Sequence, residues 1–312
     1  MTRHPTVSII MPAYRARDTI AESIRSVQAQ TLSDWELIIV DDGSPDNTAQ
    51  AAKDIAQTDP RICVVQRCNR GPSIARNSGV DLAQAEIIAF LDADDLWAPE
   101  RLAGMVDVFV QNPRAGVLFS RTRFVDAETL KPGTLTPFIP TLSATDIACE
   151  NALCSTSNIV CRSSIFTEIG GFRPGLNYAE DQDWLFRVAL SENWDIQGVD
   201  REWFFYRSSP ASQSGDLEAM RLGWSRMIET ATEIYPDNAT KAASKAYGPI
   251  HRQLARRALR MGQSQAAVKY LRMALRHDPM LLIRQPRRTL LTIAGAALSF
   301  IPSSTLKELV AQ

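Results

Sequence analysis

Residues 86–95 read EIIAFLDADD, an apolar run that passes directly into a cluster of acids. Its continuous hydrophobicity is typical of a strand that is covered on both faces of a sheet. Asp92, Asp94 and Asp95 follow the run without a spacer. The stretch therefore predicts carboxylates held at the end of a rigid, buried strand.

Other parts of the chain also contain apolar runs that are typical of buried strands. Four more apolar runs predict strands, and they lie at residues 7–11, 36–40, 62–65 and 117–119. Helical patterns separate them; for example, Ile20, Ile24 and Val27 share one face, with Asp18 as a candidate cap. This alternation predicts an α/β fold with a Rossmann-like, mostly parallel sheet flanked by helices.

Polar turns follow three of the predicted strands. They read Pro12-Ala13-Tyr14, Asp41-Asp42-Gly43-Ser44 and Asp92-Ala93-Asp94-Asp95. Ligands of such sheets bind beyond the carboxyl ends of the strands, so we expect the three turns to gather at one edge and form a site.

The charge of the chain is uneven along its length. The net charge of -1 over 312 residues gives no reason to expect a nucleic-acid partner. Residues 251–312 nevertheless hold eleven Lys and Arg against Asp278 and Glu308, which leaves 23 basic and 33 acidic residues in 1–250. The body is acidic and the C-terminal part is basic.

Cysteine usage and the ends of the chain indicate a cytoplasmic protein. The five cysteines lack paired zinc-site spacing and are expected to be buried and reduced: Cys63, Cys68, Cys149, Cys154 and Cys161. The start has no signal-peptide pattern, and the apolar part of the C-terminal segment, from Leu290 to Ile301, is too short to span a bilayer alone.

The sequence also predicts a division of the chain into domains. Residues 126–156 are rich in Thr and Pro and are interpreted as a long loop or a small excursion of the chain, and two strands are expected at Trp194–Val199 and Trp203–Arg207. The pattern from Leu217 onward is helical, and Gly262 separates two helices in a hairpin of the tetratricopeptide kind. We predict a catalytic domain over 1–215, with halves 1–120 and 121–215, and a helical region over 216–312.

The acids at 92–95 suit a divalent cation. Mg²⁺ and Mn²⁺ prefer oxygen ligands and need only one or two carboxylates when phosphates and water complete the shell. A competing interpretation is that Asp94 or Asp95 caps the next helix. Three acids in four residues exceed what capping requires, and a cation would offset their mutual repulsion.

Three more acids, Glu180, Asp181 and Asp183, open a predicted helix over 181–190. Acids stabilise the first turn of a helix, so a structural role is one interpretation. A general base that takes a proton from a hydroxyl is the other, and spacing does not decide which of the three it would be.

Further residues suit a nucleotide ligand. Asp42 would accept hydrogen bonds from a base edge, and Tyr14 would lie against its ring. Arg76 suits a phosphate or a structural carboxylate, with a surface salt bridge as the alternative.

Taken together, these segments resemble the family-2 glycosyltransferases, inverting enzymes with the nucleotide-diphospho-sugar transferase fold called GT-A. The resemblance covers Val7 to Arg207, about two thirds of the chain. Four segments in the family's order carry it: 7–14 (VSIIMPAY), 39–44 (IVDDGS), 75–79 (ARNSG) and 90–97 (FLDADDLW).

The resemblance assigns roles that spacing does not. It implies nucleotide binding by Pro12, Ala13, Tyr14, Asp42, Arg76 and Asp92. It implies that Asp94 ligates Mn²⁺ or Mg²⁺ and that Asp181 is the catalytic base. Tyr206-Arg207, with Ser212 and Ser214, resembles a segment that closes over the diphosphate, although Ser208-Ser209-Pro210 replaces the His found there in many relatives.

The activity implied is transfer of a sugar from a nucleotide-diphospho-sugar, with a UDP-sugar expected first, to a glycan or lipid-linked acceptor hydroxyl. A non-catalytic sugar-nucleotide binder is the main alternative. A nucleotidyltransferase is less well supported because the turn after the first strand lacks glycine. A phosphotransferring aspartate enzyme centred on Asp92 lacks a convincing set of partner residues.

The basic C-terminal region permits one more partner. Arg284, Arg287 and Arg288 precede the apolar residues 290–298, a pattern that suits peripheral contact with the inner face of a membrane. A helix packed on the catalytic domain with a solvated basic face is the alternative.

Overall fold

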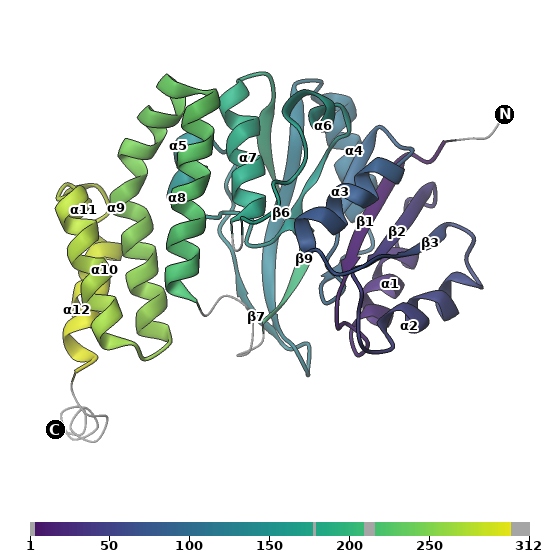
Figure 1. Ribbon diagram of the computed structural model, residues 1–312, viewed down its shortest axis with the longest axis horizontal. Helices are drawn as coiled ribbons and strands as arrows, with labels where there is room; N and C mark the ends of the chain where they lie inside the picture. Colours follow the sequence, from purple (N-terminus) through teal and green to yellow (C-terminus); the bar gives the residue numbers. More distant parts are fainter. Residues whose placement is uncertain (1–3, 177–178, 209–215, 301–312) are drawn as a thin grey trace. The chain divides into compact units, whose positions relative to one another are not determined.

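The computed structural model of the protein describes residues 4–176, 179–208 and 216–300 (Figure 1). The chain divides into two compact units. Unit 1 comprises Met1–Ser143, Asn151–Leu176 and Glu180–Ser212, and unit 2 comprises Ala144–Glu150, Asn177–Ala179 and Gln213–Gln312. The functional division at residues 215 and 216, and that at residue 120, stay predictions.

A sheet forms the centre of unit 1. Within the described residues it has nine strands, in the order β3-β2-β1-β4-β8-β6-β9-β5, with β7 paired to β6. The strands are β1 (Val7–Ala13), β2 (Trp35–Asp41), β3 (Ile62–Gln66), β4 (Ile87–Phe90), β5 (Leu96–Trp97), β6 (Ala115–Asp126), β7 (Pro132–Leu135), β8 (Val160–Arg162) and β9 (Asp195–Ser208). The β3-β2-β1-β4 half is parallel throughout, β8 runs antiparallel to β4 and β6, and β9 is parallel to β6.

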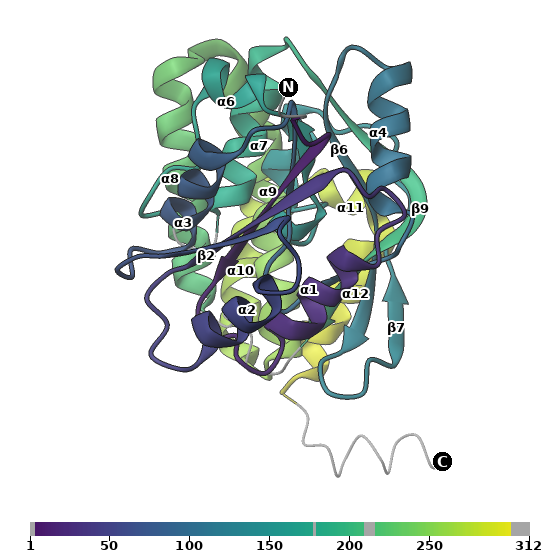
Figure 2. The ribbon, with the colours of Figure 1, turned by 90° about the vertical axis from the view of Figure 1, so that its right-hand side faces the viewer.

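Helices cover both faces of the parallel half, as the continuous apolar strands predict. Figure 2 shows β1 and β2 running between α3 on one side and α1 and α2 on the other. The helical segments of unit 1 are α1 (Ile20–Gln28), α2 (Thr48–Ala56), α3 (Pro72–Leu82), α4 (Arg101–Gln111), the 3₁₀ turn η1 (Thr156–Asn158), α6 (Ser164–Ile169) and α7 (Glu180–Ser191). The predicted stripe Ile20, Ile24 and Val27 is fully buried in the core with Val7 and Ile9.

Two predictions about unit 1 are wrong. Residues 126–156 are not one loop, because they contain β7 and the short helix α5 (Ala144–Cys149). Residues 195–208 form one long strand instead of two. β9 pairs along its length with β6, about 80 residues earlier in the chain, and this distant partner is not visible in local periodicity. β7 pairs with the nearer end of β6.

Unit 2 is helical, as predicted. Its helices are α5, α8 (Leu217–Ile234), α9 (Pro236–Arg260), α10 (Ser264–His277), α11 (Leu281–Arg284) and α12 (Pro286–Leu298). The expected hairpin is present: Gly262, at φ 69°, turns the chain between α9 and α10. Leu254, Ala258 and Tyr270 share the core of this unit. Within the described ranges, no helix has the length and apolar character needed to cross a membrane.

The five cysteines are free thiols. The expectation that they are buried is wrong for Cys63 and Cys68, which are exposed. Cys63 lies on β3, the outermost strand of the parallel half, where the face is only partly covered.

Candidate active site

The turns after β1, β2 and β4 meet at one edge of the sheet, as expected. The amide of Asp42 donates to the carbonyl of Ala13 at 2.9 Å, and the Thr19 hydroxyl donates to the carbonyl of Ala93 at 2.9 Å. The first bond joins the turn after β2 to the turn after β1. The second joins Thr19, which follows the turn after β1, to the acidic cluster.

Asp42 secures a neighbouring loop. Its buried carboxylate accepts hydrogen bonds from the amides of Arg70 (3.0 Å) and Gly71 (2.8 Å). The adjacent Gly43 has φ 69°, and a Cβ there would lie 2.8 Å from the amide nitrogen of Asn69. The approach of the two loops therefore depends on a glycine. Recognition of a base by Asp42 stays a prediction.

The other nucleotide-binding candidates differ in exposure. Ala13 is buried and Pro12 half-buried, whereas the ring of Tyr14 is 45% exposed. A flat, accessible ring at the sheet edge is free to lie against a base.

Arg76 on α3 is buried and bridges two carboxylates. Its Nη2 donates to Oδ1 of Asp92 at 2.8 Å, and its Nη1 donates to Oε1 of Glu180 at 3.2 Å. Burial by itself would lower the pKa of Arg76, but the charges of Asp92 and Glu180 raise it above its usual value. The surface salt-bridge interpretation is therefore wrong.

Asn77 and Gly79, which follow Arg76, fix the position of helix α3. The amide group of Asn77 donates to the carbonyl of Phe172 at 2.8 Å and accepts from the Phe172 amide at 2.9 Å. A Cβ on Gly79 would lie 2.3 Å from Cγ2 of Ile10, so only glycine lets α3 approach β1 this closely. Arg76, Asn77 and Gly79 of the ARNSG segment thus each have a separate structural role.

The acidic cluster is fixed by hydrogen bonds at its two ends. Asp92 donates its amide to the hydroxyl of Ser157 at 2.9 Å and accepts from the hydroxyl of Ser155 at 3.1 Å. Asp95 is buried and accepts from the amide of Arg207 at 3.1 Å. Helix α4 begins only at Arg101, so the capping interpretation of Asp94 and Asp95 is wrong.

The electrostatics of the cluster favour a cation. Loss of surrounding water and the charge of Asp92 raise the pKa of Asp94 to about 6, although this side chain still reaches solvent. Burial and the charge of Asp94 hold the pKa of Asp95 well above its ordinary value. A cation bound beside these carboxylates would offset both effects.

Asp94 fits a metal ion that is shared with a phosphate ligand. It is the exposed carboxylate of the cluster, while Asp92 and Asp95 already have protein partners. In residues 4–176, 179–208 and 216–300, no three His, Cys, Asp or Glu side chains are arranged to hold a metal by themselves. One carboxylate together with phosphate oxygens and water is a usual Mg²⁺ shell.

The three acids at the start of α7 have different surroundings. Glu180 pairs with Arg76, and the fully buried Asp183 pairs with Arg173 at 3.2 Å and Arg187 at 3.0 Å. Asp181 is buried and makes no ion pair with a residue that the structure describes. Burial and the charge of Glu180 raise its pKa to about 6. Two arginines thus neutralise Asp183, and the role of Asp181 as the catalytic base stays a prediction.

Asn151, Ser155 and Ser157 are site residues that the sequence did not reveal. Asn151 donates to Oδ2 of Asp181 at 2.8 Å, and the two serines hold Asp92. They lie within or next to the stretch that was interpreted as a loop, and short polar residues there carry no distinctive spacing.

The predicted closing segment lies beside the cluster. Arg207, at the end of β9, is buried and forms an ion pair with Glu22. Tyr206 packs against Phe124, with ring centroids 5.4 Å apart. Ser212 and Ser214 lie outside the described residues.

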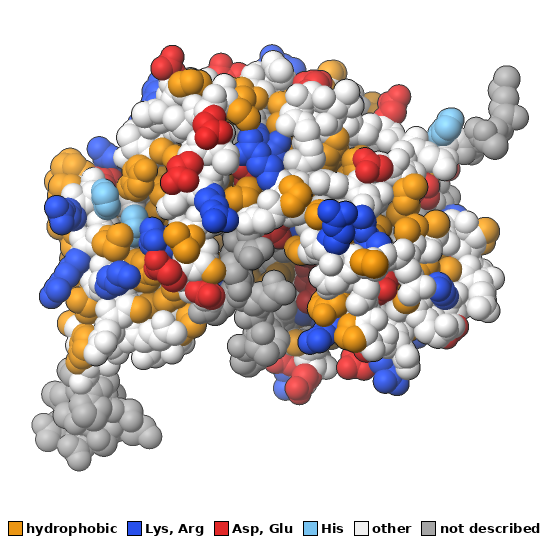
Figure 3. All heavy atoms as spheres, in the orientation of Figure 1, with side chains coloured by type: hydrophobic (Ala, Val, Ile, Leu, Met, Phe, Trp, Pro, Cys, Tyr) orange, Lys and Arg blue, Asp and Glu red, His pale blue; other side chains and the backbone are white. Residues whose placement is uncertain are grey.

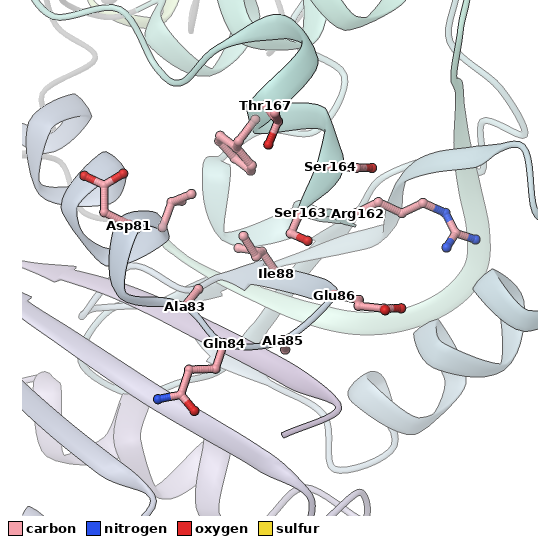
Figure 4. Close-up of a pocket in the computed structure, with 12 residues that line it drawn as sticks. Asp81, Ala83, Gln84, Ala85, Glu86, Ile88, Arg162, Ser163, Ser164 and Thr167 are labelled. Carbon is pink, nitrogen blue, oxygen red and sulfur yellow. The ribbon is translucent and has the colours of Figure 1, made fainter. Parts of the chain in front are cut away.

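A separate pocket lies at the opposite end of β4. Figure 4 shows Ile88 beside Ser163 in the middle of the lining, with the Gln84 side chain pointing away from Thr167. Asp92 follows the carboxyl end of β4, whereas this pocket surrounds its beginning, so the pocket is not part of the candidate active site.

Solved structures share the fold. A mannosyltransferase, PcManGT from Pyrobaculum calidifontis, solved with GDP-Man and Mn²⁺, superposes with a TM-score of 0.63 at 18% identity, over 95% of this chain and 87% of that one. The likeness confirms a GT-A-type fold with a helical C-terminal part.

Curated sequences provide closer relatives. The chain is 31% identical over 227 residues to the putative teichuronic acid biosynthesis glycosyltransferase TuaG of Bacillus subtilis, which covers 65% of this chain and 88% of TuaG. It is 41% identical over 107 residues to the Escherichia coli UDP-Glc:alpha-D-GlcNAc-diphosphoundecaprenol beta-1,3-glucosyltransferase WfgD, covering 34% of this chain and 42% of WfgD. For most curated relatives, the match spans less than half of their own length.

The family match covers the sheet-edge part of the site. The sequence model of the family described as "Glycosyl transferase family 2" matches residues 8–170, which include both the acidic cluster and Arg76. On this match and the likeness to TuaG, the chain belongs to glycosyltransferase family 2.

Proposed function

We propose that the protein is an inverting glycosyltransferase. It transfers a sugar from a nucleotide-diphospho-sugar, with a UDP-sugar as the first candidate, to an acceptor hydroxyl. The observation that carries the proposal is the bridge through Arg76, which ties Asp92 at the sheet edge to Glu180, the neighbour of Asp181. Donor-side and acceptor-side acids are thereby held in one rigid arrangement.

Asp181 has the properties that the proton transfer requires. A base with a pKa of about 6 is largely ionised at neutral pH and still accepts a proton readily. As the acceptor oxygen forms a bond to the anomeric carbon, its O–H bond breaks and the proton passes to Asp181. The bond from the anomeric carbon to the diphosphate breaks on the opposite face, and the electron pair leaves with the nucleoside diphosphate, so configuration inverts.

The donor side is supported by the residues at the sheet edge. Tyr14 would lie against the base, Asp42 would face its polar edge, and Asp92 would face the ribose. Asp94 would hold the divalent cation, which supplies Lewis-acid stabilisation of the diphosphate oxygens. Arg207 would contribute positive charge near the same phosphates once it exchanges its ion pair with Glu22 for contact with the diphosphate.

The acceptor class follows from the relatives. The names of TuaG and WfgD describe teichuronic acid biosynthesis and transfer of glucose to GlcNAc-diphosphoundecaprenol. We propose a glycan or lipid-linked sugar hydroxyl as the acceptor of this chain as well.

Nucleotide release tests the activity. The purified chain is incubated with UDP- and GDP-sugars, with Mn²⁺ or with a chelator, and release of the nucleoside diphosphate is measured. Loss of a general base costs about 10²- to 10⁴-fold, so Asp181→Asn should reduce release by at least about 100-fold. Asp107→Asn, which changes an exposed acid on α4, is the matched control and should leave the rate unchanged.

The same assay separates the alternatives. A non-catalytic binder would bind nucleotide sugars without releasing nucleoside diphosphate. A nucleotidyltransferase would also release none, and after addition of pyrophosphate it would convert the NDP-sugar into NTP and sugar 1-phosphate. Release that requires no metal and survives Asp181→Asn would contradict the mechanism. Determination of the anomeric configuration of the product by NMR tests inversion.

A further inference from the structure

Helix α12 is attached to unit 2 by its polar and small residues. Thr289, Thr292 and Ala296 are buried on its inner side. Nη1 of Arg252 on α9 donates to the Thr289 hydroxyl at 3.2 Å. A Cβ on Gly295 would lie 2.9 Å from Cδ1 of Leu259, so the helix lies close against its neighbour.

The three leucines of α12 are exposed, whereas Ile293 packs against the core of unit 2. Leu290, Leu291 and Leu298 are 56%, 65% and 46% exposed, and Ile283 before the helix and Phe300 after it are 70% and 59% exposed. We call these five residues the leucine face. A helix on the surface of a globular protein normally turns its apolar side toward the core, and the three leucines depart from this pattern.

Basic residues border the leucine face. Arg284, Arg287 and Arg288 are exposed and occupy the beginning of α12 and the turn before it. Arg284 and Arg288 have only loose partners, at 3.6 Å to Asp278 and 3.4 Å to Glu150. Residues 251–300 contain ten Lys and Arg against the single acid Asp278. Figure 3 shows basic side chains beside hydrophobic ones over the helices of this unit.

We propose that the leucine face and its three arginines bind the surface of an anionic lipid bilayer. A helix of 13 residues is about 20 Å long and lies in the plane of the interface, with its apolar side among the acyl chains and its arginines at the phosphates. A second copy of the chain suits the face less well, because self-association would bring the arginines of the two copies together. The inference goes beyond the transfer reaction, since it concerns where the enzyme works.

Vesicle flotation tests the proposal with the full chain. Wild type is mixed with phosphatidylcholine vesicles or with vesicles that also contain phosphatidylglycerol. Two variants probe the surface: Leu290→Ser with Leu291→Ser, and Arg284→Gln with Arg287→Gln and Arg288→Gln. The control combines Leu222→Ser with Arg226→Gln, an exposed pair on α8. Circular dichroism confirms that each variant is folded.

Wild type should float with phosphatidylglycerol vesicles, and each surface variant should lower the partition coefficient by about tenfold or more. The control should float like wild type. Equal flotation of all proteins, or no preference for anionic vesicles, overturns the proposal. A change from dimer to monomer in the leucine variant without a change in flotation assigns the face to a second copy and also overturns it. Nucleotide release without vesicles reports on the transfer activity separately, so failure of one proposal does not imply failure of the other.

Discussion

Arg76 and Glu180, 104 residues apart in the sequence, form an ion pair at 3.2 Å within the candidate site. The same guanidinium holds Asp92 with its other nitrogen at 2.8 Å. Because the Arg76 side chain is only 6% exposed, water does little to screen either pair. The acidic turn after β4 and the start of α7 are therefore connected through one buried cation.

The first prediction concerns this cation. Arg76→Met would leave Asp92 and Glu180 without a counter-charge in a mostly buried site. Removing one partner of a buried pair lowers the free energy of unfolding by about 3–5 kcal/mol. We expect a decrease near the lower end of this range because both carboxylates retain some contact with water. Urea denaturation measures it. Arg114→Met, at a 71% exposed arginine, is the control, and an equal loss there would contradict the bridge.

The second prediction is a pH dependence. Asp181 acts in its ionised form, so at saturating Mn²⁺ the rate should fall about tenfold per pH unit below about 6. The hydrogen bond from Asn151 stabilises the ionised form and lowers the pKa. Asn151→Ala should therefore move the acid limb of the rate profile to higher pH, whereas Asn193→Ala at an exposed position should not. An unmoved limb would mean that another group controls the profile.

The third prediction concerns the stability of the metal-free protein. The raised pKa of Asp94 means that its ionised form is disfavoured in the folded state, so at neutral pH it opposes folding. Asp94→Asn should raise Tm in the presence of a chelator. Mn²⁺ and UDP at about 100 times their dissociation constant should stabilise the wild type by about 2.7 kcal/mol and the variant much less. A variant that responds to Mn²⁺ and UDP like wild type would remove Asp94 from the metal site.

The fourth prediction tests the packing of α3. Gly79→Ala places a methyl group 2.3 Å from Cγ2 of Ile10, and overpacking of this kind costs about 1–3 kcal/mol. In an Ile10→Ala background the space is available, so the cost of Gly79→Ala should largely disappear. A double-mutant cycle by chemical denaturation measures the coupling. Additive effects would show that the two residues do not clash.

Much of unit 1 could be predicted from local pattern. The five predicted apolar runs correspond to β1, β2, β3, β4 and β6, and the stripe Ile20, Ile24 and Val27 lies on α1, as its pattern predicts. The acidic turn at 92–95 follows from its position at the end of a strand. Parts that depend on a distant partner were not predictable: β9 is continuous because it pairs with β6, and α5 belongs to unit 2, whose other described helices begin at residue 217.

For the candidate site, the sequence by itself determined which acids stand at strand and helix ends, because a buried strand followed by a polar turn is a local signal. It left Glu180, Asp181 and Asp183 equivalent, since all three fit the first turn of a helix. The tertiary structure separated them. Asp183 lies between two arginines and Glu180 pairs with Arg76, whereas Asp181 accepts hydrogen bonds from the side chain of Asn151 and the backbone amide of Gln182. These surroundings arise from chain segments that folding brings together, and burial then shifts the pKa values. No local sequence pattern therefore reveals the difference between the three acids.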